Sequence, residues 1–159
     1  MANWCSNVVE FKGEQSQIEE LKKLFKAMAL KEKKERRGQL PAFITDSDRG
    51  YLFDIRWEES VLYYETKWVP NITVMQQIAE HFGMDFGYGY SEPQMMVYGE
   101  AVYQNGLLVD TYLDDDDFDQ YDFDEDSDTY SFDGETYNSN DEILDILIER
   151  KKAIKSLQQ

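Results

Sequence analysis

The sequence predicts an α+β fold in which an antiparallel sheet carries two helices on one face. Short segments rich in alternating apolar residues are separated by two segments whose apolar residues follow helical spacing. Glycine, proline and Asn-Gly or Asp-Gly turn signals fall between these segments. With 159 residues, of which 42% are hydrophobic and 14% aromatic, the chain is long enough for one domain with a substantial core.

The first strand is predicted over residues 4–11 and the first helix over residues 16–35. Ser16 is the expected N-cap, with Glu19 at capping-box spacing, and Gly38 is the expected stop. The helix has an apolar stripe at Ile18, Leu21, Phe25 and Met28. Its end is strongly basic, with Lys31, Lys33, Lys34, Arg36 and Arg37. This end is expected to be solvated or to fold against an acidic part of the same chain.

Residues 51–57 and 61–68 are rich in β-forming residues and are predicted to pair as a hairpin. A second helix is predicted over residues 72–82, followed by Gly83, and a twisted strand over residues 84–90. The order β-α-β-β-α-β is that of the ferredoxin-like split βαβ arrangement.

Two further hairpins are indicated by Asn105-Gly106 and Asp133-Gly134, the strongest short hairpin signals. A helix from Ser139 to Leu157 is predicted to end the chain. We therefore expect a ferredoxin-like domain with a hairpin extension over 1–113 and an acidic loop over 114–128. The hairpin and C-terminal helix of 129–159 are expected to pack on that domain or extend it.

Two motifs resemble a family. Asn3-Trp4-Cys5-Ser6-Asn7 is similar to the start of the YubB-type proteins of bacteria, plasmids and phages, and Tyr64-Glu65-Thr66-Lys67-Trp68-Val69-Pro70 is similar to a second stretch of that family. The resemblance covers roughly residues 1–113 and leaves out the acidic segment and the last helix. It implies a ferredoxin-like fold and an origin in mobile elements, and it implies no reaction.

The charge of the chain is concentrated in one region. The formal net charge is −17, and 21 of the 33 acidic residues lie between Lys67 and Arg150, a stretch without lysine or arginine. Such a balance argues against direct binding of nucleic acid or of an anionic membrane. No stretch has the roughly 20 apolar residues that span a bilayer. The single cysteine and the absence of a signal-peptide pattern favour a cytoplasmic location.

The acidic segment is the candidate binding site, with a basic protein as the expected partner. An extended strand rises about 3.3 Å per residue, close to the roughly 3.4 Å between charges along one strand of DNA, so Asp114–Asp117 would match that charge spacing if they were extended. The segment is therefore predicted to imitate nucleic acid and to engage a nucleic-acid-binding protein or a defence nuclease. The candidate residues are Asp114, Asp115, Asp116, Asp117, Phe118, Asp119, Tyr121, Asp122, Phe123, Asp124, Glu125, Asp126 and Asp128.

Two alternatives remain open at the level of the sequence. One is a calcium site, because five aspartates occupy positions 1, 3, 5, 7 and 12 of a calcium-loop register, although position 6 is not glycine. These are Asp122, Asp124, Asp126, Asp128 and Asp133. The other is a solvated loop that only keeps the protein soluble.

No catalytic group is predicted. Cys5 and His81 are the only cysteine and histidine, and Cys5 is expected to pack as a small apolar side chain in a strand. A pocket walled by Trp68 and Tyr64 is possible on the sheet. We expect a non-enzymatic protein with no cofactor beyond weak calcium binding, and the sequence leaves its oligomeric state open.

Overall fold

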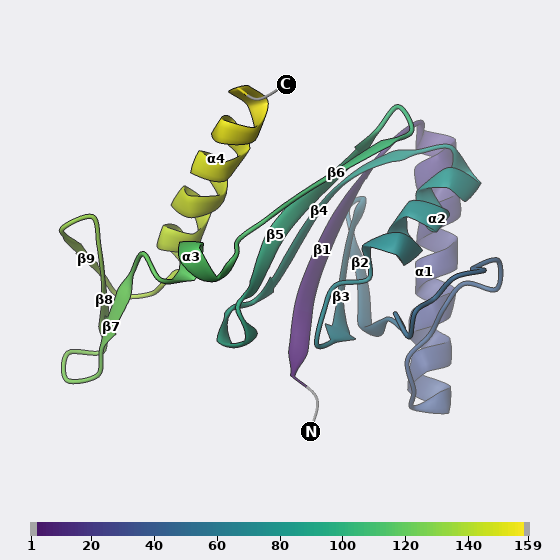
Figure 1. The fold of residues 1–159 in the computed structure, drawn as a ribbon. Helices are drawn as coiled ribbons and strands as arrows, with labels where there is room; N and C mark the ends of the chain where they lie inside the picture. Colours follow the sequence, from purple (N-terminus) through teal and green to yellow (C-terminus); the bar gives the residue numbers. More distant parts are fainter. Residues whose placement is uncertain (1–2, 158–159) are drawn as a thin grey trace.

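The computed structural model describes residues 3–157 and contains a six-stranded antiparallel sheet with the order β2-β3-β1-β4-β5-β6. Two helices cover one face of this sheet (Figure 1). The first elements are β1 (Trp4–Lys12), α1 (Gln15–Glu35), β2 (Phe53–Glu58), β3 (Val61–Lys67), α2 (Ile72–Phe82) and β4 (Asp85–Glu92). Because β1 lies between β3 and β4, with β2 outside β3, the predicted ferredoxin-like arrangement is confirmed.

The second half of the chain extends this sheet and then leaves it. Its elements are η1 (Pro93–Met95), β5 (Val97–Gln104), β6 (Leu107–Tyr112), α3 (Asp115–Phe118), β7 (Asp122–Asp124), β8 (Thr129–Phe132), β9 (Glu135–Tyr137) and α4 (Asp141–Leu157). Strands β5 and β6 continue the main sheet beyond β4, and β7, β8 and β9 form a separate small sheet. Both predicted hairpin turns are present, and all four of their central residues have positive φ, as a type I′ turn requires.

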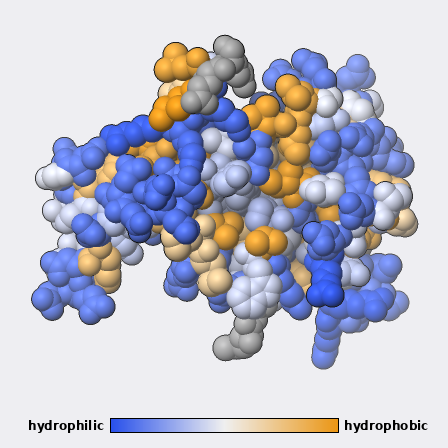
Figure 2. Space-filling model, viewed as in Figure 1, coloured by the Kyte–Doolittle hydropathy of each residue, from blue (hydrophilic) through white to orange (hydrophobic). Residues whose placement is uncertain are grey.

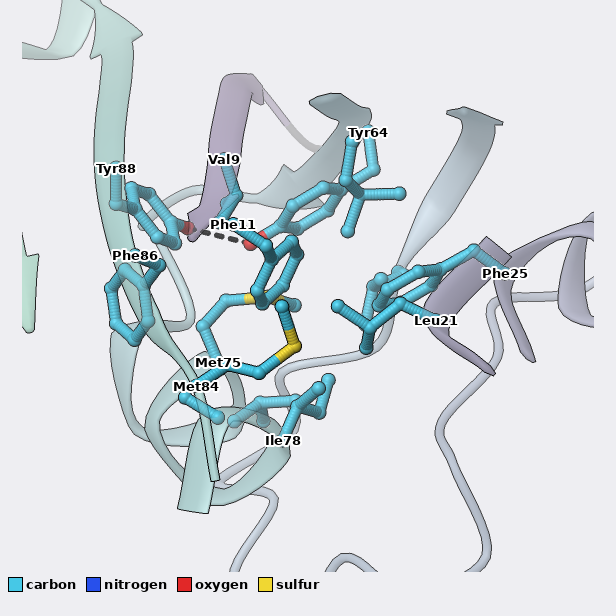
Figure 3. Packing of buried hydrophobic residues seen from close by; sticks show 14 of the residues in the cluster. Val9, Phe11, Leu21, Phe25, Tyr64, Met75, Ile78, Met84, Phe86 and Tyr88 are labelled. Atoms are coloured by element: carbon cyan, nitrogen blue, oxygen red, sulfur yellow. Dashed lines mark hydrogen bonds between the residues drawn. The ribbon is translucent and has the colours of Figure 1, made fainter. Parts of the chain in front are cut away.

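The main core lies between the sheet and helices α1 and α2. Alternate residues of β1, among them Cys5, Val9 and Phe11, are buried against the helices. The predicted stripe of α1 is buried with them, and Phe25 stacks on Trp57 with ring centroids 5.7 Å apart. Figure 3 shows side chains of α1, α2 and the strands meeting in one cluster.

The ends of α1 differ from the prediction. Glu14, rather than Ser16, is the N-cap, and Gln17 completes the capping box by accepting a hydrogen bond from the Glu14 N–H at 2.7 Å. Gln17 also donates to the Phe82 carbonyl at 2.9 Å, which ties the start of α1 to the end of α2. At the other end, Arg36 caps the helix with φ of 55°, so Gly38 is not the stop.

A second, smaller core holds the end of the chain together. We call residues 114–157 the acidic lobe. Its helix α4 packs on the face of the sheet opposite α1 and α2, where Lys152 contacts Glu100 at 2.8 Å (Figure 1). The buried side chains of this core are Leu113, Phe118, Phe132, Ile143, Leu144, Leu147 and Ile148. The prediction of an acidic loop over 114–128 was therefore wrong in part, because the segment contains a helical turn and a strand.

We expect Phe118→Ala to loosen the start of the acidic lobe, because Phe118 is only 8% exposed and anchors α3 in the second core. Removing a buried phenylalanine side chain costs roughly 3–5 kcal/mol in a well-packed core. Limited proteolysis should cleave near residues 114–121 faster in this variant than in the wild type. Phe123→Ala is the matched control, since Phe123 is 48% exposed, and equal cleavage of the two variants would contradict the prediction.

Candidate functional site

The aspartate run that opens the lobe is not extended. The N–H of Asp117 donates to Asp114 Oδ1 at 3.1 Å, and the N–H of Asp114 donates to Asp117 Oδ2 at 2.8 Å. This reciprocal capping box starts the helical turn α3, in which the rise is about 1.5 Å per residue rather than 3.3 Å. The predicted match between Asp114–Asp117 and the linear charge spacing of DNA was therefore wrong.

Two of these aspartates share one cationic partner within the lobe. Lys151 of α4 lies 3.1 Å from Asp114 Oδ2 and 2.5 Å from Asp117 Oδ2. Hydrogen bonds from Lys151 and from the Asp117 N–H lower the pKa of Asp114. Burial alone lowers the pKa of Lys151, but its hydrogen bonds with Asp117 and Asp114 outweigh that effect and raise it. Asp114, Asp117 and the buried Phe118 thus serve the internal structure of the lobe.

Most of the other predicted residues are on the surface. Tyr121 is half-buried. The exposed ones are Asp115, Asp116, Asp119, Asp122, Phe123, Asp124, Glu125, Asp126 and Asp128. Phe123 lies on β7 and packs against Tyr130 of β8, with ring centroids 4.8 Å apart. The structure therefore brings acidic side chains onto the same hairpin as the exposed Phe123, which packs on the half-buried Tyr130.

The charge of the lobe is largely uncompensated. Residues 114–157 hold 16 acidic and four basic side chains, a formal net charge of −12. Twelve of the acidic side chains form no ion pair with any described residue. They are Asp115, Asp116, Asp119, Asp122, Asp124, Glu125, Asp126, Asp128, Glu135, Asp141, Glu142 and Asp145. The face of the lobe seen in Figure 2 is predominantly hydrophilic.

The calcium register does not form a calcium loop. Asp122 and Asp124 lie on β7, which pairs with β8, so Asp126 and Asp128 are in the turn at one end of that hairpin. Asp133 lies beyond the other end, in the β8–β9 turn, where it pairs with Arg150 at 2.6 Å. Within residues 3–157, no group of three or more His, Cys, Asp or Glu side chains is placed to hold a metal ion.

A groove that the sequence did not indicate lies between α1 and the edge strand β2. We call it the basic groove; its volume is about 1010 Å³. Its cationic side chains are Lys26, Lys33, Arg36, Arg37 and Arg56, and its apolar side chains are Trp4, Ala29, Leu30, Phe53 and Ile55. The basic end of α1 therefore lines a groove at the far side of the sheet from the acidic lobe (Figure 1). Of the two alternatives for this end, folding against the acidic segment was wrong.

Sequence patterns show that the end of α1 is basic and that the first strand starts with an aromatic residue. They do not show that β2 lies beside α1, because residues 36–52 separate the two elements. The partial signal was the alternation of the first strand, which leaves Trp4 out of the buried set and 39% exposed.

The two sequence motifs meet in space around a buried asparagine. Asn7 Nδ2 donates to Thr66 Oγ1 at 3.0 Å, and Asn7 Oδ1 accepts from the Tyr88 hydroxyl at 2.6 Å. The Tyr64 hydroxyl lies 2.8 Å from that of Tyr88 and 2.5 Å from Asn71 Oδ1. Every partner in this network is buried, and burial raises the pKa of both tyrosines, so they remain neutral donors.

The same motifs also shape the chain after β3. The N–H of Trp68 donates to the Asn3 carbonyl at 2.8 Å, and Thr66 Oγ1 donates to the Val69 carbonyl at 2.7 Å. These bonds hold Trp68 at φ of 71°, a conformation that is rare for a bulky residue. Trp68 lines a cavity of about 560 Å³, whereas Tyr64 lies in the buried network and not in the wall of that cavity.

Cys5 and His81 are not associated. Cys5 is fully buried in β1, beside Asn7 and Thr66, and His81 stacks on Phe43 with ring centroids 3.8 Å apart. Burial raises the pKa of the Cys5 thiol to about 11, which removes the thiolate that nucleophilic chemistry needs.

A family model described as the ferredoxin-like domain in Api92-like protein matches residues 50–133. The chain belongs to this family. The match starts just before β2 and therefore does not include β1 and α1. In the structure these two elements pack with β2, β3, α2 and β4 in one ferredoxin-like domain. It also runs through the acidic segment, which the resemblance to YubB-type proteins had left out. The resemblance is therefore confirmed only as far as an uncharacterised ferredoxin-like family.

No curated protein and no solved structure matches the sequence. Among residues 3–157, none of the helices combines the length and the apolar character needed to cross a membrane.

We expect Asn7→Ala to lower the free energy of unfolding by about 2–4 kcal/mol, because it removes the buried hydrogen bonds that Asn7 makes with Tyr88 and Thr66. Ser6→Ala, on the exposed side of the same strand, is the control and should change stability by less than about 0.5 kcal/mol. Urea unfolding followed by tryptophan fluorescence measures both. A loss of the same size in the two variants would argue against a structural role of the motif.

The Cys5 thiol should not react with a disulfide reagent in the native protein at about pH 8, where the raised pKa leaves roughly one thiol in a thousand ionised. Denaturation should release one reactive thiol per chain, the number that the sequence contains. Absorbance of the released thiolate measures the reaction. Rapid reaction of the folded protein would show that the thiol is accessible and that the assignment of Cys5 to the core is wrong.

Proposed function

We propose that this protein is a non-enzymatic binding protein whose acidic lobe engages a basic partner protein. The observation that carries the proposal is the set of twelve exposed acidic side chains of the lobe that have no cationic partner among the described residues. The rest of the chain, residues 1–113, holds 17 acidic and 12 basic side chains and is far closer to neutrality.

The internal structure of the lobe favours binding over a role in solubility alone. Like charges held close together repel one another and destabilise a compact state. The lobe nevertheless keeps them on an ordered β7–β8 hairpin, with Phe123 exposed beside Tyr130. An exposed aromatic side chain within a charged surface supplies contact area to a partner, whereas solvation requires neither the aromatic nor the ordered strands.

Nucleic-acid-binding proteins are the partner class that we favour, because they present dense lysine and arginine surfaces to phosphates. In this proposal the lobe competes with nucleic acid for such a surface, as an inhibitor from a mobile element would. The resemblance to YubB-type proteins of plasmids and phages supports that origin, and a cytoplasmic location goes with it. The competing surface consists of β7, β8 and the turn between them, not of Asp114–Asp117.

The test compares three forms of the immobilised protein against a nuclease-treated bacterial lysate. The lobe-neutral variant carries Asn in place of Asp122, Asp124, Asp126 and Asp128, none of which forms an internal ion pair. The control carries Gln in place of Glu19, Glu20, Glu58 and Glu59, which are exposed outside the lobe. These four substitutions remove the same number of negative charges as those of the lobe-neutral variant. A partner bound by the wild type and by the control is then purified for measurement of its affinity.

We expect the lobe-neutral variant to bind that partner at least about tenfold more weakly at about 150 mM salt, with most of the binding lost when the salt is raised. Duplex DNA or RNA should displace the protein from the partner. Equal retention by all three forms, or no retained protein, would refute the proposal. If the lobe-neutral variant binds more weakly but nucleic acid does not displace the protein, nucleic-acid mimicry is refuted. Recognition of a partner by the acidic surface would still be supported.

A further inference from the structure

The basic groove gathers cationic side chains that the body of the protein leaves without an ion-pair partner among the described residues. Lys26, Lys33 and Arg36 line it without an ion-pair partner among residues 3–157. Glu32 is the acidic residue of α1 that lines the groove. Its carboxylate accepts hydrogen bonds from the N–H groups of Asp54 and Ile55 at 2.7 and 3.1 Å and does not pair with the groove cations. Two more acidic residues line the groove: Asp54, which pairs with Arg56 at 3.6 Å, and Glu65. With five cationic and three acidic side chains in its lining, the groove is net positive toward a ligand from outside.

The groove also offers apolar surface beside these cations. Trp4 packs edge-on against Phe53 with ring centroids 4.9 Å apart, and Leu30 is 71% exposed on α1. A ligand that matches both features carries carboxylates together with an aromatic side chain. The β7–β8 hairpin has this chemistry, because Phe123 is exposed on β7 and the adjoining turn carries the exposed Glu125, Asp126 and Asp128.

The hairpin cannot reach the groove of its own molecule. Figure 1 places α1 and β2 at one side of the sheet and β7–β9 at the opposite end of the molecule. Within one chain, the lobe is held in that position by the second core and by the contacts of α4 with β5 and β6. A contact between the two surfaces therefore requires two molecules.

We propose that the basic groove is the docking site for the β7–β8 hairpin of a second copy of this chain. Phe123 of one copy contacts Trp4, Leu30 and Phe53 of the other, and the acidic side chains of the adjoining turn meet Lys26, Lys33 and Arg36. The inference rests on the proposed role of the lobe as a recognition surface and names one partner for it. Reciprocal docking of two copies gives a closed dimer, the commonest symmetry of homo-oligomers.

The net charge of −17 opposes the approach of two copies at long range. At about 150 mM salt, however, charges further apart than about 8 Å are largely screened, so the contact depends on the local charges of hairpin and groove. The association is consequently weak, and it is lost at both extremes of ionic strength. Very low salt strengthens the overall repulsion, and high salt weakens the local attraction.

Sedimentation equilibrium of the full chain at about 150 mM salt and a few hundred micromolar protein tests the proposal. The groove variant carries Glu in place of Lys26, Lys33 and Arg36. The matched control carries Glu in place of Lys23, Lys31 and Lys34, which lie on the same helix outside the groove and change the charge equally. The hairpin variant carries Lys in place of Asp122, Glu125 and Asp126.

The wild type and the control should both show an average mass above the 18.8 kDa of one chain. The groove variant and the hairpin variant should each remain monomeric. An equimolar mixture of the two variants should associate again, because each native surface meets its native counterpart and each reversed surface meets the other reversed surface. Thermal unfolding of each variant by circular dichroism verifies that the fold is kept.

A wild type that remains monomeric, or a groove variant that associates as well as the control, overturns the proposal. The same holds if the mixture stays monomeric. A labelled peptide of residues 119–128 is added to the wild-type protein as a further arm. If that peptide binds the groove while the whole protein stays monomeric, the occupant is an acidic segment of another protein and not a second copy. The lysate test of the proposed function is independent of all these outcomes.

Discussion

Burial of one face of the sheet beneath α1 and α2 is the interaction on which the rest of the structure depends. Alternate residues of β1, β3 and β4 meet the apolar stripes of both helices, and each fully buried large side chain contributes roughly 1.5–3 kcal/mol. Because side chains alternate along a strand, burying one face determines which residues form the other. That second face carries Glu100 and Thr111, which receive Lys152 and Lys155 of α4. The position of the acidic lobe is therefore a consequence of the main core.

The buried polar network fixes the arrangement of the strands within this core. Asn7, Tyr64 and Tyr88 lie on the helix-facing side of the sheet, where an unpaired polar group costs free energy. With every partner in place, the network couples three strands and the start of α2 in a single arrangement. The motifs that mark this family resemblance in the sequence are thus explained by structural requirements, and they identify no catalytic residue.

The distribution of charge is the second organising feature. The cations of α4 neutralise a few carboxylates next to the second core, among them Asp117, and they leave the outward-facing hairpin negative. At the other side of the sheet, the second half of α1 and its C-cap Arg36 retain cations without an ion-pair partner among the described residues. The chain thus separates its charges on one scaffold. The binding proposed above depends on this separation rather than on the net charge.

The sequence by itself determined the order of the elements, the two Asn-Gly and Asp-Gly hairpins, and the buried stripe of α1. These features depend on local periodicity and turn chemistry, which are present in the chain before it folds. Only the tertiary structure decided the conformation of Asp114–Asp117. The ion pair of Asp117 with Lys151, 34 residues further along the chain, and the burial of Phe118 favour a helical turn over an extended strand. The basic groove was likewise decided by tertiary structure. Its walls come from elements that are distant in sequence, and no local pattern specifies which edge strand lies beside a helix.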